Sequence, residues 1–220
     1  MDGTAVAVRS VESVGSDTVA LTIETPDGFA AHPGQFVQVG ATVDGEQVAR
    51  HYTLSSPGSA AGEAGADDTF EVTVEVDPEG TLGPHLAGLD AGATIEIAGP
   101  FGDAYYEGEQ RVVVLAGGPG IGPAVGIGER ATAEGGEVVV VYQDDDPVHE
   151  ARLAGLSAAG ATVAITDDVS GEEVVGLLAN SVGQVFVYGF ADFLDEATAA
   201  LDAAGRSTED AKTENFGPAP

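Results

Sequence analysis

The sequence predicts a β + α/β fold, in which an N-terminal antiparallel six-stranded β-barrel precedes a doubly wound parallel sheet. In the first half of the chain, apolar residues alternate along short segments, as they do in strands that bury one face. From Arg111 onward, segments that are apolar throughout alternate with helical segments. This pattern is typical of a parallel sheet covered on both faces. We therefore expect two domains, residues 1–104 and 105–220.

The predicted barrel strands share a period of two, which is clearest in VALTI, QFVQV and FEVTVEV. The residues expected to face inward are Val19, Leu21, Ile23, Phe70, Val72, Val74 and Val76. Short alternating strands joined by turns, such as the turn His32-Pro33-Gly34, predict a small antiparallel barrel. The glycine- and alanine-rich stretch from Ser56 to Asp68 is expected to be an exposed loop.

The second half has a longer rhythm, in which each strand is followed by a helix. Its expected elements are, in order, strand VVVLA, a glycine-rich turn, a helix to about Glu134, strand EVVVVY, a helix over 147–159, strand TVAIT, a helix over 172–179, strand QVFVY and a helix from Asp192. This order predicts a doubly wound sheet, whose ligands bind at the carboxyl ends of the strands.

The composition restricts the possible partners. The chain has 220 residues, with 37 acidic and 7 basic side chains and a formal net charge of −30. Such a charge repels nucleic-acid phosphates and anionic membranes, so we expect neither as a partner. The excess of acid fits a folded protein of a high-salt cytoplasm, because the Debye length falls to ~3 Å in molar salt.

The sequence also argues against several kinds of functional site and against a membrane location. There is no cysteine, which excludes disulfides, thiolate metal sites and a cysteine nucleophile. The four histidines, His32, His51, His85 and His149, lack metal-ligand spacing, so we assign no metal. The N-terminus has no secretion pattern, and the apolar runs are too short to cross a bilayer. We therefore expect a soluble, cytoplasmic protein without membrane insertion.

The stretch RHYTLSS in the predicted barrel carries the first candidate site. The fork of the Arg50 guanidinium matches phosphate oxygens, and Tyr52 offers a flat apolar face. Strand alternation puts Arg50 and Tyr52 on one side and His51 and Thr53 on the other. A bulge or a strand end is therefore needed for all four to reach one ligand. In isolation, the same stretch also fits a surface arginine beside a packed tyrosine.

Two glycine motifs carry the other candidate sites. Residues 80–83, GTLG, precede a short helix, and 115–123, LAGGPGIGP, follow a buried strand and open a helix with Pro123 in its first turn. Backbone N–H groups at a helix N-terminus bind phosphate, and proline there sacrifices no hydrogen bond. For residues 80–83 the alternative is an ordinary turn with a loop glycine before a strand, and for 115–123 it is a glycine turn that only packs a helix on a sheet.

Together these motifs resemble those of the ferredoxin-NADP reductase superfamily over nearly the full length of the chain. The resemblance implies a barrel that binds FAD, a parallel-sheet domain that binds NAD(P)H, and a ferredoxin or similar electron carrier as partner. The implied FAD ligands are Arg50, His51, Tyr52, Thr53, Ser56, Gly80, Thr81, Leu82 and Gly83. The implied nucleotide ligands are Gly117, Gly118, Gly120, Ile121 and Pro123.

The resemblance also implies roles for individual residues. Arg50 pairs with the flavin pyrophosphate, Tyr52 lies against the flavin, and the Thr53 hydroxyl sits near the flavin N5. Gly83 departs from the family pattern, which has a hydroxyl at that place, and Thr81 could supply a substitute. Thr53 and Glu214 are the candidate catalytic residues, because both can handle protons at the flavin.

The C-terminal part matches the family less closely. Tyr188 and Phe190 replace the family's usual cysteine and its proline or leucine, while Gly189 remains. Tyr188 either contacts the nicotinamide or packs in the core. Glu214 and Phe216 fit the terminal acid and aromatic pattern, which implies a ring that gates the flavin; the alternative is a frayed tail.

The choice between NAD and NADP depends on the stretch QDDDPVHEARL. Asp144 could accept from a ribose 2′-hydroxyl and repel a 2′-phosphate, which favours NAD, whereas Arg152 is close enough in sequence to reach back. The aspartates also fit a solvated surface. We expect an FAD-dependent oxidoreductase that passes electrons between NAD(P)H and a carrier. The alternatives are a free-flavin or small-acceptor reductase and a non-catalytic flavin-binding subunit.

Overall fold

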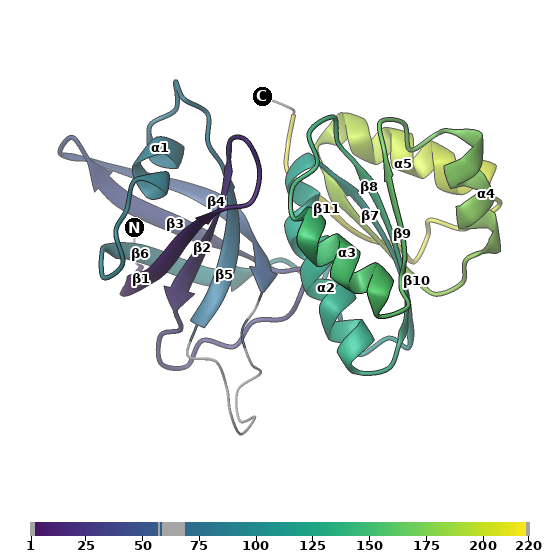
Figure 1. Ribbon diagram of the computed structural model, residues 1–220, viewed down its shortest axis with the longest axis horizontal. Coiled ribbons are helices and arrows are strands. Elements are labelled where there is room, and N and C mark those ends of the chain that lie inside the picture. The colour runs from purple at the N-terminus through teal and green to yellow at the C-terminus, as the bar shows by residue number, and fades with distance from the viewer. Residues whose placement is uncertain (1–2, 57, 59–68, 219–220) are drawn as a thin grey trace.

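The computed structural model describes residues 3–56, 58 and 69–218. It has a barrel and an α/β domain that lie side by side (Figure 1). Most of the loop predicted from Ser56 to Asp68 lies outside the described residues. Among the described residues, no helix combines the length and apolar character needed to span a membrane.

The N-terminal domain is a closed antiparallel barrel with the strand order β1-β2-β5-β4-β3-β6. Its elements are β1 (Thr4–Ser13), β2 (Thr18–Glu24), β3 (Phe36–Val43), β4 (Glu46–Ser56), β5 (Thr69–Glu75), α1 (Leu82–Ala87) and β6 (Thr94–Phe101). The inward faces of the strands form one apolar core, which includes the predicted Leu21, Ile23, Phe70, Val72 and Val74. The barrel predicted from the alternating pattern is therefore confirmed.

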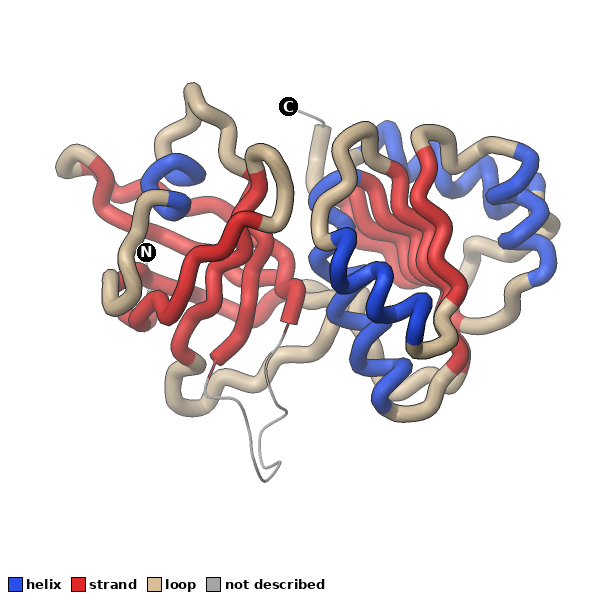
Figure 2. The backbone as a smooth tube through the Cα atoms, viewed as in Figure 1, coloured by secondary structure: helices blue, strands red, loops and turns tan. Residues whose placement is uncertain are grey.

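The second domain is a parallel sheet with the strand order β11-β10-β7-β8-β9. Its elements are β7 (Arg111–Gly117), the 3₁₀ turn η1 (Gly118–Gly120), α2 (Ile121–Ala133), β8 (Glu137–Gln143), α3 (Glu150–Ala158), β9 (Thr162–Thr166), α4 (Glu172–Asn180), β10 (Gln184–Gly189), α5 (Ala191–Ala203) and β11 (Lys212–Asn215). Figure 2 shows helices on both sides of the sheet. The predicted doubly wound sheet is thus confirmed, and β11 is an additional edge strand.

The side chains of β7 explain why its sequence is apolar throughout. Val112 and Val114 pack in the core beneath α2 and α3. Val113 and Leu115 pack in the opposite core, beneath α4 and α5. A strand buried on both faces needs apolar residues at every position.

Helix α2 also packs on the barrel, through glycines. A Cβ atom at Gly122 would lie 2.5 Å from the Thr53 Oγ1, and one at Gly126 would lie 3.2 Å from the Ser55 carbonyl oxygen. Any side chain at these positions would push the helix away from β4. The glycines therefore let the first helix of the α/β domain lie directly on the barrel strand that carries RHYTLSS.

Candidate functional site

A cavity of about 510 Å³ opens between the barrel and the carboxyl ends of the parallel strands. Its lining residues are Phe36, His51, Tyr52, Thr53, Thr73, Glu75 and Phe101 from the barrel, and Pro119, Phe190, Glu214, Asn215 and Phe216 from the α/β domain. The strand order reverses at β7, which lies between β10 and β8. Ligands of doubly wound sheets bind at such a reversal.

Strand β4 presents consecutive residues to this cavity. His51, Tyr52 and Thr53 all line it, although a regular strand would turn alternate residues to opposite sides. The pairing of β4 with β5 shifts register between Leu54 and Ser56. The irregularity lies beyond these three residues, near the end of β4 at Ser56, whereas His51, Tyr52 and Thr53 themselves pair regularly with β3.

Thr53 joins the two domains at the cavity wall. Its side chain is buried, and its hydroxyl donates to the Pro119 carbonyl oxygen of the glycine-rich turn at 3.3 Å. The Gly122 position of α2 lies directly behind the same hydroxyl. Thr53 is therefore held from both sides, at the place where the barrel meets the glycine-rich turn of the α/β domain.

Aromatic rings form most of the remaining wall. Phe190 and Phe216 meet edge to face, with ring centroids 6.1 Å apart. Phe36 and His51 meet in the same way at 5.4 Å. Burial raises the pKa of Tyr52, an effect that nearby Arg50 partly offsets, so the phenol stays protonated. The cavity is therefore lined mainly by aromatic rings.

The C-terminal segment is fastened beside this wall. The Phe216 N–H donates to the Gly189 carbonyl oxygen at 2.9 Å, and the Ala191 N–H donates to the Gly217 carbonyl oxygen at 2.9 Å. Backbone hydrogen bonds therefore hold the chain as far as Gly217, which supports an ordered segment over a frayed tail. Burial, and then the charge of Asp103, raise the pKa of Glu214. Its carboxyl group can hold a proton at a higher pH than an exposed glutamate.

A second cavity, of about 290 Å³, adjoins the first and shares Thr73, Glu75, Pro119 and Phe190 with it. Its other lining residues are Asp17, Thr18, Gly118, Ile121, Tyr142, Asp144, Asp146 and Val148. None of these described residues is cationic. Burial, followed by the charges of Asp17, Asp144 and Asp77, raises the pKa of Glu75. This cavity therefore has a strongly negative wall.

The positions in the turn after β7 require glycine for different structural reasons. A Cβ atom at Gly117 would lie 2.4 Å from the Phe193 ring, and one at Gly120 would lie 2.2 Å from the Tyr188 carbonyl oxygen. These two glycines are required for packing. Gly118 has a φ of +51° and open space where a Cβ would point, on the side of the second cavity. Ile121 lines this cavity, whereas Pro123 is buried in the first turn of α2.

Asp144 is held in place at the second cavity. One carboxylate oxygen accepts from the Tyr142 hydroxyl at 2.8 Å, and the other accepts from the Asp146 N–H at 2.9 Å. Arg152 does not reach back toward Asp144. Its guanidinium instead donates to Glu129, Glu71 and the Ser55 carbonyl oxygen.

Of the two roles expected for Tyr188, the structure supports packing in the core and not contact with a nicotinamide. The Tyr188 side chain is fully buried and its hydroxyl donates to the Ala104 carbonyl oxygen at 2.5 Å. It shares a face of β10 with Phe186, with ring centroids 6.4 Å apart. Strand alternation therefore turns Tyr188 into the core, and Phe190 lines the cavity in its place.

Several other predicted ligands lie outside both cavities. Arg50 is exposed and its Nη1 donates to the Ala49 carbonyl oxygen at 2.9 Å. Ser56 ends β4, and Gly189 packs on Phe193. Gly80 and Thr81 precede α1, where Thr81 makes no side-chain cap and Leu82 is buried in the barrel core. Gly83 packs on the end of β5, where a Cβ atom added to it would lie 3.1 Å from the Glu75 carbonyl oxygen.

Many lining residues were not predicted from the sequence, and three of them, Thr73, Glu75 and Phe190, lie outside the set of predicted ligands and line both cavities. Thr73 and Glu75 line both cavities from the end of β5, and Phe190 lines both from the turn after β10. The only signal for the barrel residues was their position at the end of a predicted strand. The signal for Phe190 was its place directly after the last buried strand, at the edge where ligands of such sheets bind.

Comparison with known proteins adds evidence on the class of protein. Residues 5–106 match the model of the oxidoreductase FAD-binding domain. The chain is 34% identical over 161 residues to an NADPH oxidoreductase of Mycobacterium tuberculosis, covering 69% of this chain and 42% of that protein. It is 32% identical over 121 residues to an NADH-cytochrome b5 reductase-like protein of Emericella nidulans, covering 54% of this chain and 25% of that protein. The chain thus spans less than half the length of these relatives.

Solved structures share the fold over the whole chain. The FAD/NAD-binding domain of nitric oxide dioxygenase from Vibrio cholerae superposes with a TM-score of 0.79 at 20% identity, covering 99% of this chain and 100% of that chain. A ferredoxin NADP⁺ reductase from Neisseria gonorrhoeae, solved with bound FAD and NADP, gives 0.75 at 17% identity, covering 99% of both chains. The predicted two-domain fold is therefore confirmed. The similar proteins are oxidoreductase enzymes, and the barrel matches their FAD-binding domain.

Proposed function

Because its barrel matches the oxidoreductase FAD-binding domain and its whole chain has the two-domain reductase fold, we propose that this protein is an FAD-dependent NAD(P)H oxidoreductase. It passes electrons to or from a carrier protein of the ferredoxin type. We place the flavin-binding domain at residues 1–104 and the nucleotide-binding domain at 105–220, in a high-salt cytoplasm. The observation that carries the proposal is a pair of adjoining cavities with shared lining residues, beside which Thr53 of the proposed flavin motif donates to Pro119 of the proposed nucleotide motif.

The larger cavity fits a flat ring system. Tyr52 and Phe216 supply aromatic walls, Thr53 a buried hydroxyl, and Glu214 a partly buried carboxyl group. Bound FAD would supply redox chemistry in steps of one or two electrons. The protein orients the ring, and Phe190 and Phe216 keep water from it. Glu214, whose pKa is raised, holds or releases a proton beside the ring.

The remaining flavin ligands are proposed from the resemblance alone. Arg50 must turn from the Ala49 carbonyl oxygen to meet a pyrophosphate, which a long exposed side chain can do at little cost. The segment from Gly80 to Gly83 would present backbone N–H groups to the same phosphates. His51 lines the cavity directly, and Ser56 lies at the end of the same strand.

The first test is reconstitution with FAD in molar potassium chloride, followed by anaerobic addition of NADH or NADPH. We expect a coloured flavoprotein whose visible flavin absorption is lost on adding nucleotide. A protein that stays colourless contradicts the FAD site. A coloured protein that no nucleotide bleaches would instead support the alternative of a non-catalytic flavin-binding subunit. Reduction of added free flavin in preference to a carrier protein would support the alternative of a flavin reductase.

We further propose that NADH is preferred over NADPH. A 2′-phosphate needs a cationic partner, and no cation occurs among the described residues of the second cavity. Arg152, the nearest candidate in sequence, is bonded to Glu129 and Glu71. Asp144 is fixed at the cavity wall, where its charge opposes a phosphate.

The expected preference is at least about tenfold in kcat/KM, which corresponds to about 1.4 kcal/mol. Asp144→Asn keeps the size of the side chain and removes its charge, so kcat/KM with NADPH should rise relative to that with NADH. Asp145→Asn is the matched control, because Asp145 is exposed and lies outside the cavity lining. Equal use of both nucleotides by the unmodified protein would contradict the proposal.

A further inference from the structure

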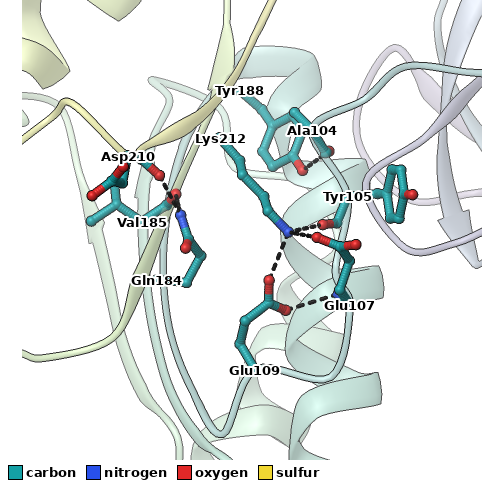
Figure 3. Close-up of polar contacts among 9 residues, drawn as sticks. All are labelled: Ala104, Tyr105, Glu107, Glu109, Gln184, Val185, Tyr188, Asp210 and Lys212. Carbon is teal, nitrogen blue, oxygen red and sulfur yellow. Dashed lines mark hydrogen bonds and ion pairs between the residues drawn. The ribbon is translucent and has the colours of Figure 1, made fainter.

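Lys212 is the only lysine in a chain with a net charge of −30, and it begins the edge strand β11. Its side chain is 19% exposed. The ammonium group donates to the Tyr105 carbonyl oxygen at 2.7 Å, to Glu107 at 2.8 Å and to Glu109 at 2.7 Å (Figure 3). These three acceptors use all three N–H donors of a lysine. All of them belong to the linker between the barrel and β7.

The linker is itself attached to both domains. The Tyr106 N–H donates to the Pro33 carbonyl oxygen of the barrel at 2.9 Å, and Tyr188 donates to the Ala104 carbonyl oxygen (Figure 3). Among the residues that the structure describes, Lys212 is the one residue of β11 whose side chain hydrogen-bonds to this linker. It therefore fastens the C-terminal strand to the segment that connects the domains.

Electrostatics favour this fastening. Burial alone would lower the pKa of Lys212, but its hydrogen bonds to the Glu107 and Glu109 carboxylates outweigh burial and raise the pKa. Burial alone would raise the pKa of Glu109, but the bonds from Lys212 and from backbone N–H groups outweigh it and lower the pKa. Both groups therefore stay charged. The ammonium also lies 5.3 Å from the centroid of the Phe186 ring, within the range of a cation–π contact.

The contact between Lys212 and the linker affects the candidate site because β11 carries Glu214 and is followed by Phe216. Side chains two apart share a face of a strand, so Lys212 and Glu214 point to the same side. Glu214 lines the larger cavity, and Phe216 follows directly after the strand. Within the described part of the chain, strand β11 pairs with β10 alone, over the four positions from Lys212 to Asn215. A short edge strand of this kind opens readily unless a side chain holds it.

We propose that Lys212 is a positioning residue, which holds Glu214 and Phe216 at the cavity by clamping β11 to the linker residues Tyr105, Glu107 and Glu109. The roles of Glu214 and Phe216 in the reaction rest on the proposed function, whereas the clamp itself does not. Lys212 touches neither cavity. Its effect on the site passes through the backbone of β11.

The test uses the full flavin-free chain, so that its outcome does not depend on FAD binding. In Lys212→Met, we expect the amide of Phe216 to exchange its hydrogen at least tenfold faster, because β11 opens. The raised pKa of Glu214, followed by NMR of its carboxyl carbon, should fall toward the ordinary value as the group becomes solvated. Removal of a nearby positive charge without movement would raise this pKa instead, so the two effects have opposite signs. Asp103 and Tyr188 also face Glu214 and are unchanged in the variant.

Three further variants complete the test. Lys212→Arg should restore both readings, because arginine can still donate to the linker. Thr213→Ala alters an exposed position on the other face of β11 and should change neither reading. Glu109→Gln weakens the ion pair with Lys212 from the linker side. If Lys212→Met does not fold, the same two measurements on Glu109→Gln test the proposal. Unchanged Phe216 exchange in both Lys212→Met and Glu109→Gln, or a Glu214 pKa that rises, overturns the proposal. Failure to bind FAD in the unmodified chain would overturn the proposed function and leave these readings valid.

Discussion

Replacing Arg152 by methionine is expected to lower the free energy of unfolding by about 3 kcal/mol, because the change leaves carboxylates unpaired at the domain interface. Arg152 lies on α3 of the α/β domain. Its guanidinium pairs with Glu71 of the barrel at 2.8 Å and with Glu129 of α2 at 2.6 Å. It also donates to the Ser55 carbonyl oxygen at 2.7 Å. Methionine keeps most of the buried stem, so the loss isolates the charged head.

The estimate takes the lower end of the range for breaking a buried pair, which is about 3–5 kcal/mol. The reason is exposure: the side chain of Arg152 is 23% exposed and that of Glu71 is 25%, but Glu129 is 44% exposed and can turn to water. Glu71 cannot relax as easily, because it also accepts from the Ser55 hydroxyl at 2.6 Å.

Urea unfolding at fixed salt measures this loss. Arg111→Met serves as the control, because the pair of Arg111 and Glu137 is 54% and 71% exposed. Its removal should cost less than about 1 kcal/mol, as exposed ion pairs usually do. If the two variants lose the same stability, Arg152 is not a clamp between the domains.

The sequence was sufficient for the fold because each half has one consistent pattern. The alternating Val72 and Val74 are typical of a strand that buries one face in the core. The consecutive valines of 112–114 are typical of a strand that is buried on both faces. The pattern did not require β11. Its four residues, KTEN, are polar, and they are held by backbone pairing and by the side chain of Lys212.

Part of the candidate site was also predictable. Thr53, Tyr52, Glu214 and Phe216 were selected from distant motifs, and the structure brings them to one cavity. The motifs did not predict which way a side chain points at the end of a strand. Tyr188 occupies the expected strand position but points into the core, because alternation places it on the same face as Phe186.

Contacts across the domain interface were beyond sequence reasoning for a different reason. Arg152 and Glu71 are separated by 81 positions, and Thr73 and His149 by 76. No local period links such residues, since their meeting depends on how α2 packs on β4. The same holds for the glycines: Gly117 and Gly120 match a phosphate-binding motif, yet their lack of a side chain is required by Phe193 and by the Tyr188 carbonyl oxygen.

His149 should make the stability of the interface depend on pH. Its imidazole is buried and its Nε2 lies 2.7 Å from the Thr73 Oγ1, across the interface. Burial, and then the charge of Arg152, lower the pKa of His149 from 6.5 to about 4. The unfolded chain therefore takes up a proton near pH 6.5 that the folded chain refuses until about pH 4. The stabilisation is complete above the higher value and is lost as the pH falls through this window.

The expected loss over the window is about 3 kcal/mol, since one pKa unit corresponds to about 1.4 kcal/mol. This loss must be measured as the difference in unfolding free energy between the unmodified protein and a variant without His149, because many carboxylates begin to titrate at the lower end of the pH window. His149→Asn is suited to this, since His149 has a φ of +56° and asparagine accepts that conformation. The variant should be the less stable protein at neutral pH, and urea unfolding should show the two stabilities converging toward pH 4. A difference that stays constant with pH would mean that the folded His149 is protonated as readily as a free one. Convergence would mean that neutral His149, in contact with Thr73 of the barrel, stabilises the fold at a position that borders both cavities.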